Sequence, residues 1–273
     1  MYLKHWKLVR RPFEERLDPT CYFGSAHHQG VLIHLRSLVS EHTPIVLLAG
    51  DVGCGKSTVA SALAHSLPVE SHPVHIVPVA PGTADGILEL MLNELQQAKL
   101  NQHLVMIIDG FYGLAECEFR ELVASLQSGE TPGKNTSTTI LIGSTELLVL
   151  ANRLGKSAPG LFPQLVLGAM APADSIGYIS HRLRLAGGDG SLFTREAISL
   201  IHELSGGIPR RINRLCDLCL LIGFSQDRPQ ISESIVWTAQ RELRVLAPTR
   251  TATAPATRRW RQLRRTQAST LDR

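Results

Sequence analysis

The chain has 273 residues, of which 44% are hydrophobic, and its formal net charge is +4. This length predicts one large domain or a domain with a smaller attachment, and no apolar run approaches the roughly 20 residues of a membrane helix, so we expect no membrane-spanning segment. Five scattered cysteines and a charged N-terminus without an apolar signal segment argue against a secreted disulfide protein and predict a cytoplasmic one.

The first 43 residues form a mixed prefix that we expect to pack on the core. Within it, residues 30–40 carry apolar side chains at helical spacing and predict a helix. The apolar run Ile45–Gly50 follows and is short enough to be a buried strand. Beyond a glycine-rich loop, a second helix is expected because Val59, Leu63 and Leu67 recur on one face.

Strands and helices then alternate up to residue 171. We expect strands at residues 74–79, 104–108, 139–142 and 165–169, helices at residues 83–99 and around 119–126, and a loop at residues 128–138. Such alternation is typical of a parallel sheet with helices on both faces. The sequence therefore predicts, for residues 44–171, a three-layer αβα core with a five-stranded parallel sheet.

From residue 172 to residue 245 the pattern is entirely helical. Glycine pairs at 187–188 and 206–207 end two helices, and Thr194 is placed to cap one. Pro209 stands at an early helical position, where its missing N–H costs nothing, and Ser232 is placed to cap the last helix. A small four-helix domain is therefore predicted after the core.

The loop after the first strand carries the clearest functional motif. It reads GDVGCGKS and matches the phosphate-binding pattern G-x-x-x-x-G-K-[ST] between a predicted strand and a predicted helix. Backbone N–H groups and the helix N-terminus would bind the phosphates, Lys56 would bridge the β- and γ-phosphates of ATP, and Ser57 would complete the Mg²⁺ shell. The expected nucleotide contacts are Gly50, Asp51, Val52, Gly53, Cys54, Gly55, Lys56, Ser57 and Thr58.

Asp109 directly follows the apolar run 104–108. A phosphate-binding loop of this kind needs an acidic residue at the end of a neighbouring strand to hold the metal through water. An aspartate after a strand can also be a simple helix cap, but the buried run before it favours the metal role. We therefore predict that Ser57 and Asp109 hold the Mg²⁺ of bound ATP.

Two stretches resemble one known family, the AAA+ ATPases typified by ExeA and GspA of bacterial secretion systems, which are themselves similar to transposition ATPases. The first stretch is the prefix, with Trp6, Pro12-Phe13, Asp18-Pro19, Tyr22, Ser25 and His28. The second is the segment 181–217 with its SGGIPR. The resemblance covers about residues 1–245. It implies a P-loop NTPase core followed by an all-α AAA+ lid over residues 172–245.

The resemblance also implies roles for single residues. Arg210, in GGIPR, matches the sensor 2 arginine that reaches the γ-phosphate from the lid, so we group it with Lys56 and Asp109 as catalytic. Ser144 falls where a sensor 1 polar residue sits, although an ordinary serine is an equal alternative there. The prefix around residues 12–22 would help to wall the adenine pocket.

Two groups for hydrolysis depart from the family pattern. The position after Asp109, where the family carries a water-orienting glutamate, is Gly110. A positioned carboxylate of this kind is worth about two to four orders of magnitude in rate. The family also carries an arginine before its fifth strand that reaches the nucleotide of the neighbouring subunit. The corresponding stretch here, GLFPQLVLG, has no arginine, and the nearest upstream one is Arg153. The sequence thus supports ATP binding more strongly than ATP hydrolysis.

Three functions remain open at this stage. The first is an ATP-hydrolysing motor or switch of the ExeA type that forms homo-oligomers and acts on a protein, envelope or DNA partner. The second is a regulatory or assembly module that binds ATP without hydrolysing it. The third is a DNA-associated ATPase of the transposition type.

Basic residues concentrate in the C-terminal segment 246–273, which holds seven arginines and one aspartate and so carries +6, leaving −2 for residues 1–245 of a chain at +4. Its richness in Thr, Ala, Pro and Arg predicts disorder. Five arginines around Trp260 could bind nucleic acid or an anionic membrane, which would place the protein at the periphery of the inner membrane. A tail that only keeps the protein soluble is an equal alternative.

Cys216 and Cys219 have the spacing of half a zinc site. No second cysteine pair accompanies them, and both fall on the apolar face of a predicted helix. We therefore expect them to pack in a core rather than to bind a metal.

Overall fold

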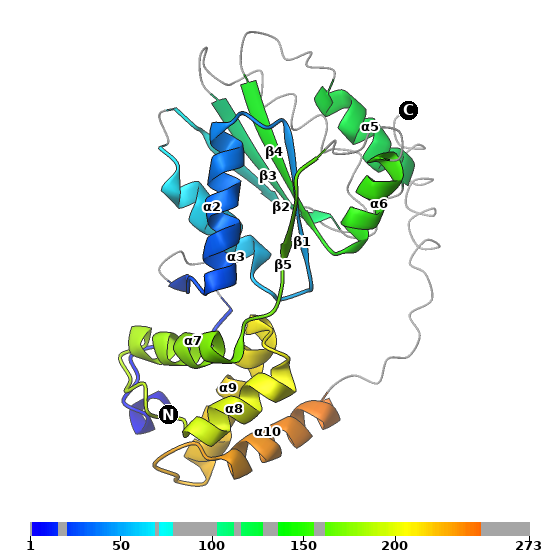
Figure 1. The fold of residues 1–273 in the computed structure, drawn as a ribbon. Helices are drawn as coiled ribbons and strands as arrows, with labels where there is room; N and C mark the ends of the chain where they lie inside the picture. The colour runs from blue at the N-terminus through cyan, green and yellow to red at the C-terminus, as the bar shows by residue number, and fades with distance from the viewer. Residues whose placement is uncertain are drawn as a thin grey trace, which may run out of the picture.

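The computed structural model describes residues 2–15, 21–68, 71–78, 103–111, 116–127, 136–155 and 162–246. In Figure 1 these residues form two parts, a sheet flanked by helices and a helical bundle beneath it. The chain passes from the first part to the second after strand β5 (Gln164–Leu167). None of the helices in the described ranges has the length and apolar character needed to cross a bilayer.

The sheet has five parallel strands in the order β2-β3-β4-β1-β5, which confirms the predicted α/β core. Strand β1 (Ile45–Gly50) lies between β4 (Thr136–Gly143) and β5, and all six of its residues are buried. Strand β3 (His103–Phe111) separates β4 from β2 (Val74–Pro78). Such strands are covered on both faces, so their sequences are continuously apolar rather than alternating.

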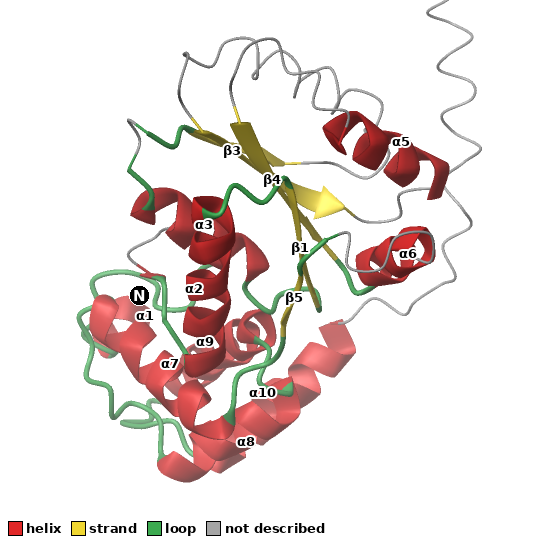
Figure 2. Cartoon of the chain, turned by 45° about the horizontal axis from the view of Figure 1, so that its top comes forward, coloured by secondary structure: helices red, strands yellow, loops and turns green. Residues whose placement is uncertain are grey.

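Helices cover the sheet on both sides, as Figure 2 shows. On one face α2 (Ala26–Ser40) and α3 (Lys56–Ser66) pack over the inward residues Val46 and Leu48 of β1. On the other face Leu47 of β1 packs with residues of α5 (Glu116–Gln127) and α6 (Glu146–Gly155). Because successive strand residues point to opposite faces, one short apolar run serves both layers.

The second part is a bundle of four helices, α7 (Pro172–Leu185), α8 (Arg195–Ser205), α9 (Pro209–Ser225) and α10 (Glu233–Leu246). The Thr194 hydroxyl accepts a hydrogen bond from the backbone N–H of Ala197, and Gly206 ends α8 with a φ of 61°. Cys216 and Cys219 are fully buried in this bundle. Over the described ranges, no group of three or more His, Cys, Asp or Glu side chains is placed to bind a metal ion.

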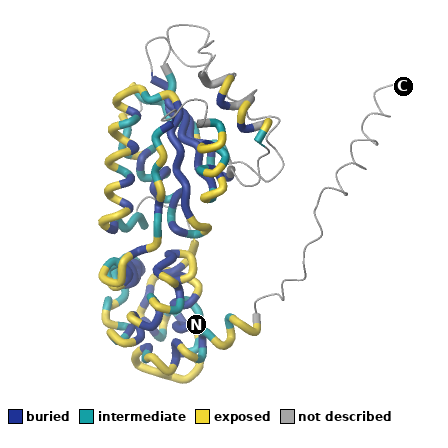
Figure 3. The backbone as a smooth tube through the Cα atoms, turned by 45° about the vertical axis from the view of Figure 1, so that its right-hand side comes forward, coloured by how far each residue is buried: buried dark blue, intermediate teal, exposed yellow. Residues whose placement is uncertain are grey.

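The prefix divides between the two parts, so the prediction that it packs on the core is wrong for its first residues. Helix α1 (Tyr2–His5), Trp6 and Phe13 belong to the buried cluster of the helical bundle. The indole N–H of Trp6 donates to the carbonyl oxygen of Leu220 (3.0 Å). Helix α2 instead packs on the sheet, and Tyr22 packs against the same cluster. Tyr2, Trp6 and Phe13 lie in the bundle, and Figure 3 shows the buried positions of both parts.

Several boundaries differ from the sequence prediction. Helix α2 begins four residues earlier than residue 30, because the Ser25 side chain accepts from the backbone N–H of His28 and caps it. Strand β4 begins at Thr136 rather than at residue 139. Helices α1 and α6 were not predicted. The predicted helix 83–99, the pair Asp18-Pro19 and the tail from residue 247 lie outside the described residues.

Candidate functional site

The loop between β1 and α3 is shaped by glycines in backbone conformations that other residues rarely adopt. Gly53 has a φ of 86° and Gly55 a φ of 106°. Gly55 occupies the N-cap position of α3 without any side chain to cap the helix. The first backbone N–H groups of α3 therefore receive no side-chain cap there, and they are donors of the kind that bind phosphate.

Lys56 lies folded into this loop. Its ammonium group donates to the carbonyl oxygens of Gly50 and Asp51, both at 2.8 Å, and its Nζ is 3.9 Å from the Cys54 Sγ. The side chain is only 4% exposed. Among the described residues no carboxylate pairs with Lys56, so its positive charge is available for an anion that enters the loop.

His28 supports the loop from the neighbouring helix α2. Its Nε2–H donates to the Cys54 carbonyl oxygen (2.9 Å), and its Nδ1 is 2.6 Å from the Ser25 hydroxyl oxygen. A carbonyl can only accept, so Nε2 carries a proton, and in the neutral ring Nδ1 then accepts from the Ser25 hydroxyl. Burial lowers the pKa of His28, which favours this neutral form. A Cβ atom on Gly55 would lie 2.8 Å from the His28 Nε2, so the ring also fills the space beside the loop.

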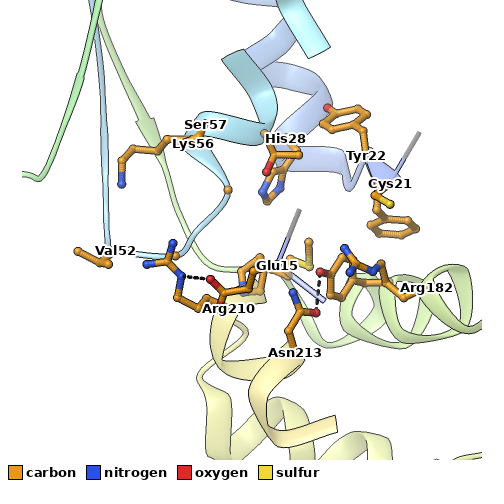
Figure 4. A pocket seen from close by; sticks show the side chains of 17 residues that line it. Glu15, Cys21, Tyr22, His28, Val52, Lys56, Ser57, Arg182, Arg210 and Asn213 are labelled. Carbon is orange, nitrogen blue, oxygen red and sulfur yellow. Dashed lines mark hydrogen bonds and ion pairs between the residues drawn. The ribbon is translucent and has the colours of Figure 1, made fainter. Parts of the chain in front are cut away.

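A cavity of about 280 Å³ opens between the sheet part and the bundle. Val52, Gly53, Gly55, Lys56, Ser57 and Thr58 line it from the loop and α3, and Arg210 lines it from α9. Figure 4 shows Lys56 and Ser57 on one wall of the cavity and Arg210 on the facing wall. The structure thus brings together seven of the predicted contact residues, while Gly50, Asp51 and Cys54 contribute the oxygen and sulfur atoms around Lys56.

The sequence analysis gave no individual site role to several polar residues that line the cavity, although Glu15 falls in the prefix 12–22 that was expected to wall the adenine pocket. These residues are Glu15, His28, Tyr178, Arg182 and Asn213. The Tyr178 hydroxyl donates to the Asn213 Oδ1 (2.8 Å), and the Arg182 guanidinium lies 5.8 Å from the Tyr178 ring centre. Tyr22 also lines this cavity, and its hydroxyl is buried without a hydrogen-bond partner among the described residues.

Asp109 and Ser144 are not among the residues that line the cavity. Asp109 lies at the carboxyl end of β3, paired with Ile142 of β4, and Ser144 follows β4 directly. The Ser144 hydroxyl is buried without a hydrogen-bond partner in the described parts of the chain. Both residues lie toward the carboxyl-terminal edge of the sheet, where β1 also leads into the loop, and among the described residues no hydrogen bond or ion pair joins either of them to Lys56 or Ser57.

Gly110 is held in an irregular strand. The register of β3 against β4 shifts between Asp109 and Phe111, and Gly110 has a φ of 121°. Glu116, an acidic residue further on, lies 3.2 Å from a terminal nitrogen of Arg120 and 3.4 Å from one of Arg153. Gly110 thus forms part of an irregular strand, and Glu116, the next glutamate along the chain, is paired with two arginines.

Comparisons with known proteins found curated relatives of two kinds. No protein family model matches it. It is 28% identical over 254 residues to General secretion pathway protein A of Aeromonas hydrophila, a match that spans 85% of this chain and 46% of that protein. It is 29% identical over 182 residues to a tRNA dimethylallyltransferase of Bordetella avium, spanning 66% of this chain and 54% of that enzyme. The chain therefore spans about half the length of the curated relatives it matches.

Solved structures share the fold. The Aeropyrum pernix ORC1 protein in complex with DNA has a TM-score of 0.63 at 14% identity, over 87% of this chain and 70% of that one. The Thermotoga maritima RuvB Holliday junction branch migration motor has a TM-score of 0.58 at 19% identity, over 81% and 70% of the two chains. At these identities the likeness establishes the fold, a P-loop NTPase core followed by an AAA+ helical lid.

Proposed function

We propose that this chain, which has the AAA+ fold and is similar to General secretion pathway protein A, binds ATP with Mg²⁺ between its core and its lid (residues 172–246) and acts as a motor or switch of the ExeA type. The observation that supports this proposal most directly is the cavity in which Lys56 and Ser57 of the core face Arg210 of the lid. A triphosphate placed there would touch both parts at once, so that its γ-phosphate would couple to the position of the lid.

The residues that line the cavity are suited to bind a nucleoside triphosphate. The uncapped N-terminus of α3 and the glycines at positive φ offer backbone N–H groups, and Lys56 offers a buried cation. Bound Mg²⁺ would neutralise charge on the phosphates, with Ser57 and Asp109 as its protein groups. Tyr22 and its neighbours in the prefix would wall the adenine. Ser144 stays a proposed sensor of the γ-phosphate.

Hydrolysis by the isolated chain is expected to be slow. Gly110 supplies no carboxylate to orient water, and Arg153, the nearest upstream arginine to β5, is engaged with Glu116. The missing groups would have to come from a neighbouring subunit or a partner, which is why we propose a homo-oligomer with a protein, envelope or DNA partner. A module that binds ATP without turning it over is the second candidate, and Gly110 in its irregular strand is the observation that favours it.

A DNA-associated role would depend on the basic segment 247–273, which lies outside the described residues. It predicts DNA binding that weakens steeply with salt and disappears when that segment is deleted. The same segment could instead hold the protein at an anionic membrane. Binding of this kind to liposomes rather than to DNA would favour a cytoplasmic protein peripheral to the inner membrane.

The proposal is tested by ATP binding and phosphate release of the purified chain, measured alone, with DNA and with liposomes. We expect ATP to bind, and binding to be lost in Lys56→Ala but kept in Lys4→Ala, which removes the same charge from the exposed side of α1. Binding without release in all conditions would favour the non-hydrolysing module. Phosphate release that persists in Lys56→Ala would come from a contaminant and would refute the proposal that this chain is an ATPase.

A further inference from the structure

The backbone before Glu15 is fixed on the lid. Phe13 is 3% exposed and its ring meets that of Phe193 edge to face, with centroids 6.1 Å apart. The Arg182 guanidinium donates to the carbonyl oxygens of Pro12 and Glu14, both at 2.6 Å. Arg182 is itself 93% buried, at 7% exposure. The residue that follows this anchored stretch therefore has a defined place at the cavity wall.

Arg210 is fixed from the other side. Its backbone N–H donates to the carbonyl oxygen of Gly53 (3.2 Å), so the start of α9 rests on the phosphate-binding loop. Its Nε lies 3.2 Å from the Glu15 Oε2. In Figure 4 the two terminal nitrogens of Arg210 point away from Glu15, toward the side of the cavity where Lys56 and Val52 lie.

Among the described residues, Arg210 forms its ion pair with Glu15 through the Nε, and its two terminal nitrogens have no hydrogen-bond or ion-pair partner. An arginine can bind phosphate through such remaining donors. A free arginine side chain loses much rotational freedom when it binds, and one that is already held loses less. A carboxylate that competed for the two terminal nitrogens would contact them, whereas the Glu15 Oε2 is paired with the Nε.

We propose that Glu15 is a positioning residue that holds Arg210 ready for the γ-phosphate of ATP and so sets the preference for ATP over ADP. The proposal rests on the proposed function, since it assumes that nucleotide phosphates occupy the cavity. Glu15 and Arg210 are both 50% exposed, so their pairing is of the modest strength of a surface ion pair.

The test is a titration of the full chain with fluorescent ATP and ADP analogues in Mg²⁺ buffer. Glu15→Ala is expected to weaken ATP binding by about one and a half to five fold, the range of an exposed ion pair, and to leave ADP binding unchanged. Glu15→Gln keeps an oxygen that can accept from the Arg210 Nε and should recover part of the loss. In an Arg210→Ala background, Glu15→Ala should have no further effect, because the group that it positions is gone.

Glu242→Ala is the matched control, since it removes the same charge from the exposed face of α10. It should change neither affinity, and thermal melting should show that all variants fold. Tighter ATP binding by Glu15→Ala would mean that the carboxylate competes with phosphate, and this would overturn the proposal. An equal change for ADP, or an effect that persists without Arg210, would also overturn it. If the unaltered chain binds neither nucleotide, the proposed function itself is wrong.

Discussion

The backbone N–H of Arg210 donates to the carbonyl oxygen of Gly53, and an ideal Cβ on Gly53 would lie only 2.5 Å from the Cβ of Arg210. The first turn of a lid helix thus rests directly on the loop that is proposed to bind phosphate. A movement of this loop on nucleotide binding is therefore expected to shift the start of α9. The contact gives the core and the lid a short mechanical connection that does not depend on the nucleotide itself.

Gly53→Ala should therefore impair nucleotide binding more than backbone strain alone explains. The new methyl group would push against Arg210 and would also occupy a φ of 86°. Gly206→Ala is the matched control, because Gly206 has a φ of 61° but has nothing within 4 Å of its ideal Cβ. Strain should cost each variant about 1–2 kcal/mol of unfolding free energy. Only Gly53→Ala should weaken ATP binding, by about tenfold. Equal affinities in the two variants would mean that the contact is unimportant.

Restoring a glutamate after Asp109 should fail to restore rapid hydrolysis. Gly110 is buried and has a φ of 121°, so any side chain there is strained by about 1–3 kcal/mol, and a carboxylate must also be desolvated. We expect Gly110→Glu to lower the melting temperature more than Gly110→Ala and to leave phosphate release unchanged. A faster release by Gly110→Glu alone would show that the missing carboxylate is the main deficit of the site.

The sheet and the phosphate-binding loop could be predicted because their signals are local. The apolar run of β1 and the glycines around Lys56 lie within a dozen consecutive residues. Glu15 and Arg182 could not be found in this way, since Arg182 reaches the carbonyl of Pro12 across 170 positions of the sequence. The residues next to Pro12 and those next to Arg182 give no sign in the sequence that the two are in contact.

The start of β4 and the presence of α6 also could not be predicted from local sequence patterns. The segment before residue 139 is polar and was predicted as a loop, yet Thr138 is fully buried in β4 because its hydroxyl lies 2.9 Å from the His103 Nε2 of the neighbouring strand. Helix α6 was missed because an apolar run as short as that of Glu146–Gly155 does not distinguish a helix from a strand. In both cases the structure of the segment depends on the element that it packs against, which lies far away in the sequence.

His103 should make the fold less stable in mild acid. Burial and the nearby rings of His42 and His72 lower the pKa of His103 to about 4. Its pKa in the unfolded chain is about 6.5, so the unfolded state takes up a proton first as the pH falls. The unfolding free energy is therefore expected to decrease as the pH falls from about 6.5 toward 4.

Replacing this ring should flatten that dependence. Denaturant unfolding of His103→Gln at pH 7 and pH 5 should show a smaller difference between the two values than the unaltered chain shows. His65→Gln is the control, because His65 lies on the exposed side of α3. If His103→Gln and His65→Gln change the difference between the unfolding free energies at pH 7 and pH 5 by the same amount, His103 is not the cause of the pH dependence.

Cys216 and Cys219 should respond as core residues and not as metal ligands. Both are fully buried on α9, and burial raises the pKa of each thiol. Cys216→Ser buries a hydroxyl where a weakly polar thiol stood and should destabilise the lid by about 1–3 kcal/mol, whereas Cys216→Ala should cost less because it leaves only a small cavity. Incubation with a chelator should leave the melting temperature of the unaltered chain unchanged, because packing does not depend on a metal. A chelator that lowers the melting temperature, with serine and alanine variants equally destabilised, would instead identify the pair as part of a metal site.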